Sequence, residues 1–262
     1  MSWTQQAGLP AGATIWISAG VSDDGQVIVA VALNGGMYRS KDGGASWSRI
    51  DTAFNAAENL DYESVAVSAD GARIVAAVMG GGIWTSADGR AEAPTFTQAA
   101  VAGGGPITGY WRAVDSDATG MRVVAASHNG DVWISDDGGA TFVPLSVSVA
   151  GSAIADGWYR IALSRDGSTL ALAGNEDYGI GVVAGSRSTG LYVGHFAAGG
   201  WTFSRASGVV GSYTRLAIAA DAPTIAATLS GTGGKCWSPP TTAPRSRACP
   251  RRAATARGAA SR

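Results

Sequence analysis

The chain has 262 residues, of which 46% are hydrophobic and 15% are charged, and its formal net charge at pH 7 is −1. This composition excludes a disordered protein, because it supplies enough apolar side chains for a large core. The small net charge argues against a nucleic-acid partner, and the 38 glycines indicate many short strands joined by tight turns.

Neither the start of the chain nor its cysteines indicate a compartment. The first residues contain no charged segment followed by an apolar run, so we expect no signal peptide in the sequence as given, and no apolar run is long enough to span a membrane. Both cysteines, Cys236 and Cys249, lie near the C-terminus, so we expect no disulfide in the folded part. The compartment and the oligomeric state therefore stay open.

Five similar units follow one another along the chain. Each unit begins with an aromatic residue and an alternating strand, near residues 16, 62, 111, 158 and 213. A corner such as Ser68 to Gly71 then leads to a nearly continuous apolar strand, which we expect to be covered on both faces. Apolar strands of this kind are predicted over 27–31, 74–78, 123–126 and 170–173. A glycine-rich second turn, a third strand, a third corner and a fourth strand complete each unit.

The third corner has the same residue pattern in three of the units. The shared residues are Ser40, Asp42, Gly44 and Trp47 in the first unit, Ser86, Asp88 and Phe96 in the second, and Ser135, Asp137, Gly139 and Phe142 in the third. In the second unit the insert 90–94 displaces the closing aromatic residue. A short Asp side chain can accept backbone N–H groups, glycine permits positive φ, and the aromatic residue packs between sheets. Because such a turn folds by itself, we assign these residues a structural role.

The spacing Ser-x-Asp-x-Gly-x-(Ser/Thr)-(Trp/Phe) resembles the Asp-box, or bacterial neuraminidase repeat, of β-propellers. The resemblance covers residues 1–234 and implies an all-β propeller, or an incomplete one, of about five visible four-stranded blades, truncated from six or seven. The period of the units also fits a four-stranded blade of roughly 40–50 residues. The family includes sialidases, xyloglucan-cleaving hydrolases, sortilin-type receptors and photosystem assembly factors, and it is often extracellular or exported. It therefore implies a fold and not an activity.

Two segments depart from the repeat. In the fourth unit an insert from Asn175 to Ser188 precedes the third strand, and the corner from Gly194 to Trp201 has no aspartate. We predict a relaxed turn there and a long surface loop, in which Glu176, Asp177 and Tyr178 either line a ligand site or are simply solvated. At the N-terminus, Trp3 resembles the closing aromatic of a corner. Either this segment completes the last blade, or an upstream part of the gene product is missing.

The tail 235–262 is rich in Arg, Pro and Ala and has no strand pattern. One interpretation is a basic disordered tail that binds an acidic partner. The other is a frameshift at the Lys235 codon, because reading the codons one base earlier permits Ser-Thr-Asp-Asn-Gly-Ala-Thr-Phe, a complete corner in register. We expect the frameshift, in which case the tail has no function of its own.

Charged residues near the starts of the first strands are candidates for chemistry. Arg112, Arg160 and Arg215 occupy this position in successive units, with Tyr62 and Glu63 in an earlier one. Resemblance to sialidases would imply three arginines that bind a carboxylate, a Tyr–Glu nucleophile pair and an acidic Asp. The arginines, however, stand at different offsets from their aromatic residues, and the Phe-Arg-Ile-Pro segment of sialidases is absent. We therefore expect a non-catalytic scaffold with a protein- or glycan-binding face, and keep a remnant of a sialidase-type glycoside hydrolase as the alternative.

No cofactor or metal is expected. His128 and His195 are the only histidines and belong to different units, with no ligand partner at a fixed spacing. The glycine-rich segment 103–105 links two units and is not a phosphate-binding turn between a strand and a helix.

Overall fold

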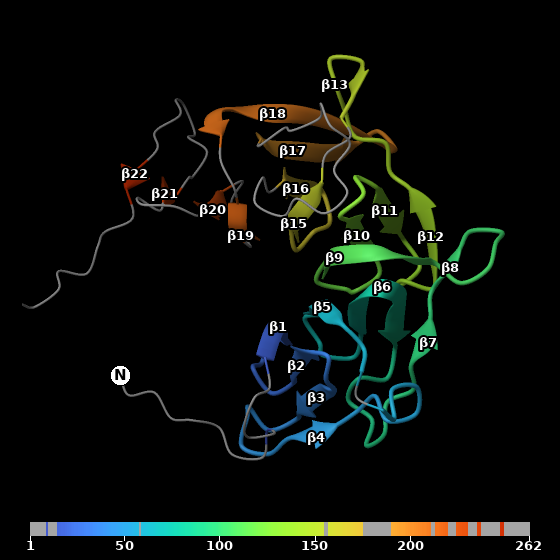
Figure 1. Ribbon diagram of the computed structural model, residues 1–262. Coiled ribbons are helices and arrows are strands. Elements are labelled where there is room, and N and C mark those ends of the chain that lie inside the picture. Colours follow the sequence, from blue (N-terminus) through green and yellow to red (C-terminus); the bar gives the residue numbers. More distant parts are fainter. Residues whose placement is uncertain are drawn as a thin grey trace, which may run out of the picture.

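The computed structural model describes residues 9, 15–57, 59–154, 157–174, 190–210, 213–219 and 224–229, and the short strands 235–236 and 247–248. In this part of the chain every regular element is a strand, and the sheets follow one another around a central axis as the blades of a propeller (Figure 1). The predicted all-β propeller class is confirmed.

The first blade is a four-stranded antiparallel sheet in sequential order. Its strands are β1 (Ile15–Val21), β2 (Ile28–Leu33), β3 (Met37–Ser40) and β4 (Ser48–Arg49).

The second blade contains a strand that is longer than the sequence indicates. Its strands are β5 (Tyr62–Val67), β6 (Ile74–Ser86) and β7 (Thr97–Gln98). β6 runs through the predicted turn at Gly80–Gly82: its first half pairs with β5 and its second half with β7, so that it supplies two of the four strands. The turn also pairs with the next blade, Gly81 with Gly109, because residues without side chains allow this close approach.

The third blade is β9 (Thr108–Ser116), β10 (Val123–Ser127), β11 (Val132–Ser135) and β12 (Thr141–Pro144). Its outer strand β12 pairs in parallel with β8 (Ala100–Val101), which belongs to the connection from the second blade. The hairpin of β13 (Ser148–Val149) and β14 (Ser152–Ala153) then projects from the rim of the propeller (Figure 1).

The fourth blade is β15 (Trp158–Leu163), β16 (Thr169–Gly174), β17 (Gly190–Ala197) and β18 (Gly200–Val210). The relaxed turn expected at its third corner is wrong. Ala197 pairs with Gly200, and the two residues between them, Ala198 and Gly199, have φ angles of 50° and 80°. Two successive positive φ angles make a tight hairpin turn, which needs no aspartate. The insert 175–188 lies outside the described residues.

The fifth unit contributes the pair β19 (Tyr213–Ile218) and β20 (Ile225–Leu229). Within the segment predicted as a tail, β21 (Lys235–Cys236) pairs with β22 (Arg247–Ala248), and the remainder of 235–262 lies outside the described residues.

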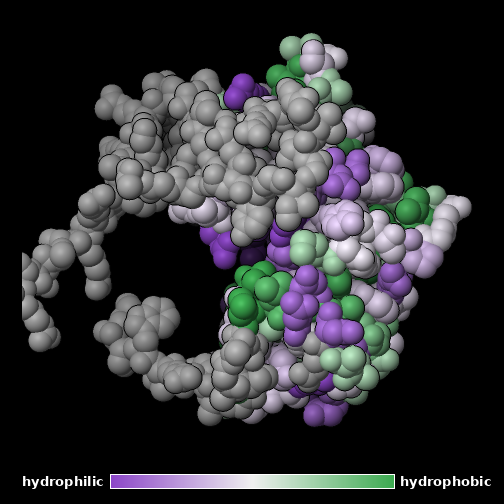
Figure 2. Space-filling view, in the orientation of Figure 1, coloured by the Kyte–Doolittle hydropathy of each residue, from purple (hydrophilic) through white to green (hydrophobic). Residues whose placement is uncertain are grey.

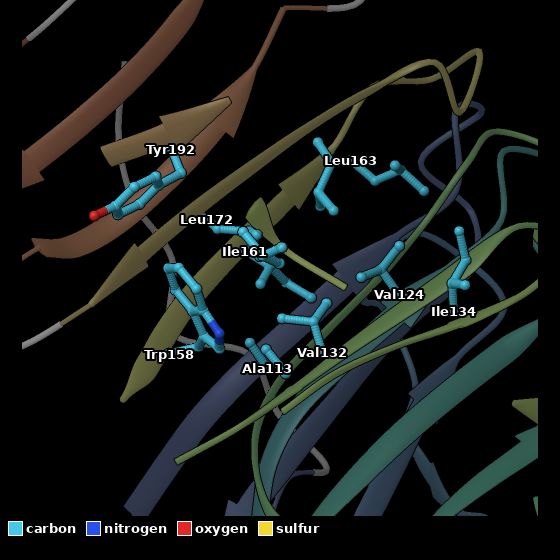
Figure 3. Packing of buried hydrophobic residues seen from close by; sticks show 12 residues of the cluster. Ala113, Val124, Val132, Ile134, Trp158, Ile161, Leu163, Leu172 and Tyr192 are labelled. Carbon is cyan, nitrogen blue, oxygen red and sulfur yellow. The ribbon is translucent and has the colours of Figure 1, made fainter. Parts of the chain in front are cut away.

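The core lies between the blades. Four clusters of buried apolar side chains each join one sheet to the next, as expected for second strands whose residues are apolar on both faces. In Figure 3, Val124 and Val132 of the third blade face Trp158 and Leu172 of the fourth. The burial of these neighbouring faces holds the first strand of every blade beside the axis.

Candidate functional site at the central channel

The first strand of each blade carries the same irregularity. In β1, β5, β9, β15 and β19 the register with the second strand shifts at the residue that follows the aromatic. The shifted residues are Ile17, Glu63, Arg112, Tyr159 and Thr214. In such a bulge two residues of one strand stand opposite a single partner residue, which re-aims their side chains.

The bulges bring the three arginines together. Arg112 is the first residue after its aromatic, whereas Arg160 and Arg215 are the second, and the sequence suggested that these offsets would separate them. All three instead line one cavity of about 250 Å³, together with Glu63. The cavity takes residues from all five first strands, among them the apolar Ile17 and Leu216.

Glu63 and Arg112 form an ion pair at the edge of this cavity. Glu63 Oε1 lies 2.7 Å from Arg112 Nη1, and their side chains are 10% and 12% exposed. Burial raises the pKa of Glu63, while the positive charges of Arg112 and Arg160 act against this rise. Glu63 is the only carboxylate among the described residues that line the cavity. The pair of carboxyl groups that glycoside hydrolysis uses is therefore not found among those residues.

Arg160 and Arg215 converge on the same acceptor. Arg160 Nε and Arg215 Nη1 donate to the Thr214 carbonyl oxygen at 2.8 and 2.9 Å. Neither arginine forms an ion pair with a described carboxylate. Burial lowers the pKa of Arg160, and the like charge of Arg215 lowers it further, while Tyr159 and the negative charge of Glu63 act against this fall. Two guanidinium groups that share one neutral oxygen form a site that favours an anion.

An aromatic ring connects these two pairs. The Tyr159 ring lies 3.9 Å from the guanidinium carbon of Arg160 and 5.8 Å from that of Arg112, within the range of cation–π attraction. Glu63, Arg112, Tyr159, Arg160 and Arg215 thus form a continuous series around the channel, with three positive charges and one negative. Sequence reasoning missed Tyr159, although it directly precedes Arg160.

Side chains of one blade bind the backbone edge of the next. Ser18 Oγ accepts the N–H of Val65, and Ser64 Oγ donates to the Val114 carbonyl. Asp115 Oδ2 accepts the N–H of Leu163 at 2.8 Å. With the bond from Arg160 to Thr214, each of β5, β9, β15 and β19 receives one such bond along the channel.

The first corners are linked to one another where the first strands end. The N–H of Asp23 donates to the carbonyl of Ala69, that of Ala69 to Ala118, and that of Ala118 to Arg165. The Arg165 guanidinium forms an ion pair with Asp23, which connects the fourth corner with the first. These bonds draw the blades together at that end, away from the arginine cavity.

The third corners have similar hydrogen bonds in the first three blades. Asp42 Oδ1 accepts the hydroxyl of Ser40 at 2.7 Å and the N–H of Ser46 at 2.8 Å, and Asp42 Oδ2 accepts the Ser46 hydroxyl. The bonds from Ser46 and Ser40 lower the pKa of Asp42 to about 2. Asp137 bonds Ser135 and Thr141 in the same way.

In the second blade the insert leaves the corner intact, since Asp88 Oδ1 accepts the N–H of Thr95 at 2.8 Å. Gly44 and Gly139 have φ angles of 95° and 83°. Of the aromatic residues that close the corners, Phe142 is fully buried and Phe96 packs against the core between the first two blades, whereas Trp47 is half-buried and its Nε1 donates to the Gly44 carbonyl. None of the eleven corner residues named from the sequence lines the arginine cavity.

The structure does not bring Tyr62 and Glu63 together as the nucleophile pair that sialidase chemistry would require. Tyr62 is fully buried, and its hydroxyl donates to Asp51 Oδ2 at 2.9 Å. Asp51 in turn binds Arg49 and Asn55, a buried network that no sequence pattern indicated. The adjacent Glu63 faces the channel, so the two side chains point to different places.

The other candidates do not form a site in the described part of the chain. His195 is exposed and contacts Thr169, and no group of three metal-ligating side chains occurs among the described residues. Glu176, Asp177 and Tyr178 lie outside the described residues. Nor does the described part contain a helix that is long and apolar enough to cross a lipid bilayer.

The comparisons with known proteins concern the fold. The scan with protein-family models gave no match, and neither did the sequence search of curated proteins. Among solved structures, YCF48 from Cyanidioschyzon merolae is 14% identical with a TM-score of 0.61, covering 93% of this chain and 74% of that one. YCF48 bound to D1 peptide is 12% identical with a TM-score of 0.58, covering 90% and 70%.

A GH74 enzyme from Niastella koreensis is 17% identical with a TM-score of 0.55. The match covers 84% of this chain but only 29% of that enzyme. At these identities the similarities show a propeller fold and no particular activity.

Proposed function

We propose that this chain is an Asp-box propeller that acts as a non-catalytic scaffold, and that its channel cavity binds an acidic group of a protein partner. The observation that carries this proposal is the convergence of Arg160 and Arg215 on the Thr214 carbonyl, where neither forms a salt bridge with a described carboxylate. Two guanidinium groups held side by side repel each other, and a bound anion offsets this repulsion through charge-assisted hydrogen bonds.

A protein ligand is favoured by the fold and by the content of the cavity. One of the similar propellers, YCF48, has been solved bound to D1 peptide, which supports a binding role for a propeller of this kind. The cavity here also contains apolar side chains beside the arginines, a combination that suits a peptide.

Binding of labelled peptides tests this function. We expect fluorescein-labelled hexaglutamate to bind, with an affinity that falls as salt is raised, and hexaglutamine not to bind. Arg215→Ala and Arg160→Ala should each weaken hexaglutamate binding at least tenfold by fluorescence anisotropy. Lys41→Ala is the control, because Lys41 lies in the outer loop and pairs with the exposed Glu92. Equal binding by the arginine variants and the control would refute the proposal.

We also propose that Asp42, Asp88 and Asp137 stabilise turns and bind no ligand. Their carboxylate oxygens are engaged by hydroxyl and N–H groups of their own corners. This local role needs no partner.

A remnant of a sialidase-type hydrolase is the second candidate, favoured by the presence of three arginines and one Glu in a single cavity. Cleavage of a fluorogenic sialoside, lost in Glu63→Gln, would establish it. The absence of cleavage at high protein concentration would leave the binding scaffold as the better account.

For the tail 235–262 we propose a frameshift at the Lys235 codon. DNA sequencing across this codon tests the proposal, since codons that cannot encode the alternative corner would exclude it.

A further inference from the structure

In the first strand of each blade, only certain backbone N–H and C=O groups face the channel. The groups bonded by the preceding blade are the N–H of Val65, the carbonyl of Val114, the N–H of Leu163 and the carbonyl of Thr214. These residues stand one, three or five positions after their aromatic. Residues at odd offsets from the aromatic therefore turn their N–H and C=O groups toward the channel edge.

β1 has the same register but receives no such bond from the described residues. The residues at odd offsets from Trp16, one, three and five positions after it, are Ile17, Ala19 and Val21. The structure records no hydrogen bond from a described side chain to the backbone of these three residues, in contrast to β5, β9, β15 and β19. Within the described part of the chain, β1 is thus a sheet edge whose channel-side N–H and C=O groups have no side-chain partner.

The side chains along this edge are apolar and exposed. Ile15 is 56% exposed, Val21 57% and Trp16 36%. In the second, third and fourth blades the residues three positions after the aromatic, Val65, Val114 and Ile161, are buried, whereas Ala19 at this position of β1 is exposed. Figure 2 shows the hydrophobic surface over β1 directly beside hydrophilic surface at the central opening.

We propose that β1 is the docking edge for an extended peptide segment of the partner. This inference rests on the proposed function and specifies its ligand: the peptide backbone pairs with Ile17–Val21, its apolar side chains cover Ile15 and Val21, and an acidic side chain reaches Arg160 and Arg215. Charge complementarity selects this occupant, because Ile17 and Ala19 line the same cavity as the two arginines. Strand addition supplies affinity through main-chain bonds, and the alternate side chains supply specificity.

Alternate N-methylation of a peptide tests the main-chain bonds. The probe is fluorescein-labelled (Val-Glu)3, with its three Val amides or its three Glu amides methylated. Only one edge of an added strand pairs with β1, so one methylated peptide should bind at least tenfold more weakly and the other like the parent. If Arg215→Ala weakens binding but both methylated peptides bind equally, the proposed function survives and the docking edge is wrong.

A protein variant gives an independent measurement. Ala19→Pro removes the N–H at the centre of the edge, and proline is tolerated where a strand N–H faces away from its own sheet. We expect at least tenfold weaker binding of (Val-Glu)3, whereas Lys41→Ala, in the outer loop, should bind like the parent. Thermal melting of both variants shows whether they fold. If Ala19→Pro does not fold, the methylated peptides decide.

Two other occupants of the β1 edge, a second copy of the chain and the chain's own residues 1–14, would give different results in these experiments. If the chain is a dimer that Ala19→Pro dissociates, and the peptide does not bind, the edge belongs to a second copy and the proposal is overturned. If (Val-Glu)3 binds only after residues 1–14 are deleted, the edge belongs to the chain itself, and the proposal is likewise overturned.

Discussion

Single aspartates at neighbouring positions have different roles in the third corners. Asp137 accepts hydrogen bonds from three donor groups of its turn, whereas the adjacent Asp136 forms an exposed ion pair with Arg122. We expect Asp137→Ala to lower the free energy of unfolding by about 1 kcal/mol, the typical effect of losing a side-chain cap on backbone N–H groups. Asp136→Ala should cost less than about 0.5 kcal/mol. Chemical denaturation measures both values, and equal losses would contradict the structural role of Asp137.

Asp115 makes stability depend on pH in the opposite sense to the corner aspartates. Burial raises its pKa to about 6 from an ordinary value of 3.8, although the N–H groups of Leu163 and Ser116 favour the ionised form. A raised pKa in the folded state means that the folded protein binds the proton more tightly. The stability contributed by this proton is therefore fully present below pH 3.8 and is lost as the pH rises through 6.

Asp115→Asn removes this dependence. We expect the unfolding free energy of the parent to fall relative to that of the variant between pH 4.5 and 7.5, by about 2 kcal/mol. Denaturation at the two pH values gives the difference. A constant difference across this range would show that Asp115 titrates normally in the folded protein.

At the scale of strands and loops, the alternating and continuous apolar patterns predicted the β elements because these patterns record which faces are covered. They could not predict the bulges, since a one-residue shift leaves the composition of a strand unchanged. For this reason the offset of Arg112 from Arg160 suggested separate positions, whereas both side chains line one cavity. Tyr62 and Glu63 show the opposite case: they are neighbours in the sequence, but their side chains lie apart because adjacent residues of a strand point to different faces.

The insert 90–94 shows a second limit of sequence reasoning. The sequence indicated a simple extension of a turn. In the structure, however, Arg39 of the first blade, which is 1% exposed, binds the insert. The Arg39 guanidinium donates to the carbonyls of Gly89, Ala91 and Glu92. A bond between residues about 50 positions apart leaves no local pattern, so only the packed structure can reveal it.

Replacement of Arg39 should release this loop. We expect Arg39→Met to destabilise the protein by roughly 2–4 kcal/mol, because three carbonyl groups lose their buried donor. Trypsin should also cleave faster after Arg90 in limited proteolysis. Lys41→Met, which removes only the exposed pair with Glu92, should leave the cleavage rate unchanged. Similar rates in the two variants would mean that Arg39 does not hold the loop.

At the scale of the molecule, every core cluster joins two adjacent blades, so each blade is stabilised mainly by its neighbours. Repeat proteins of this kind can lose structure on one side of a damaged interface and keep it on the other. The backbone bonds between the first corners act against this, because they couple successive blades near the axis. Which effect dominates decides whether the propeller unfolds as one unit.

Trp158→Ala distinguishes these possibilities. Trp158 is fully buried between the third and fourth blades, edge-on to Tyr192, and its Nε1 donates to the Gly130 carbonyl. We expect a loss of about 3–5 kcal/mol, as for other buried tryptophans, and a smaller loss for Trp201→Ala, because Trp201 is only partly buried. In hydrogen exchange, β16 and β17 should lose protection while β2 keeps it, since the first interface is untouched. Equal loss in β2 and β16 would show instead that the linked corners make all the blades open together.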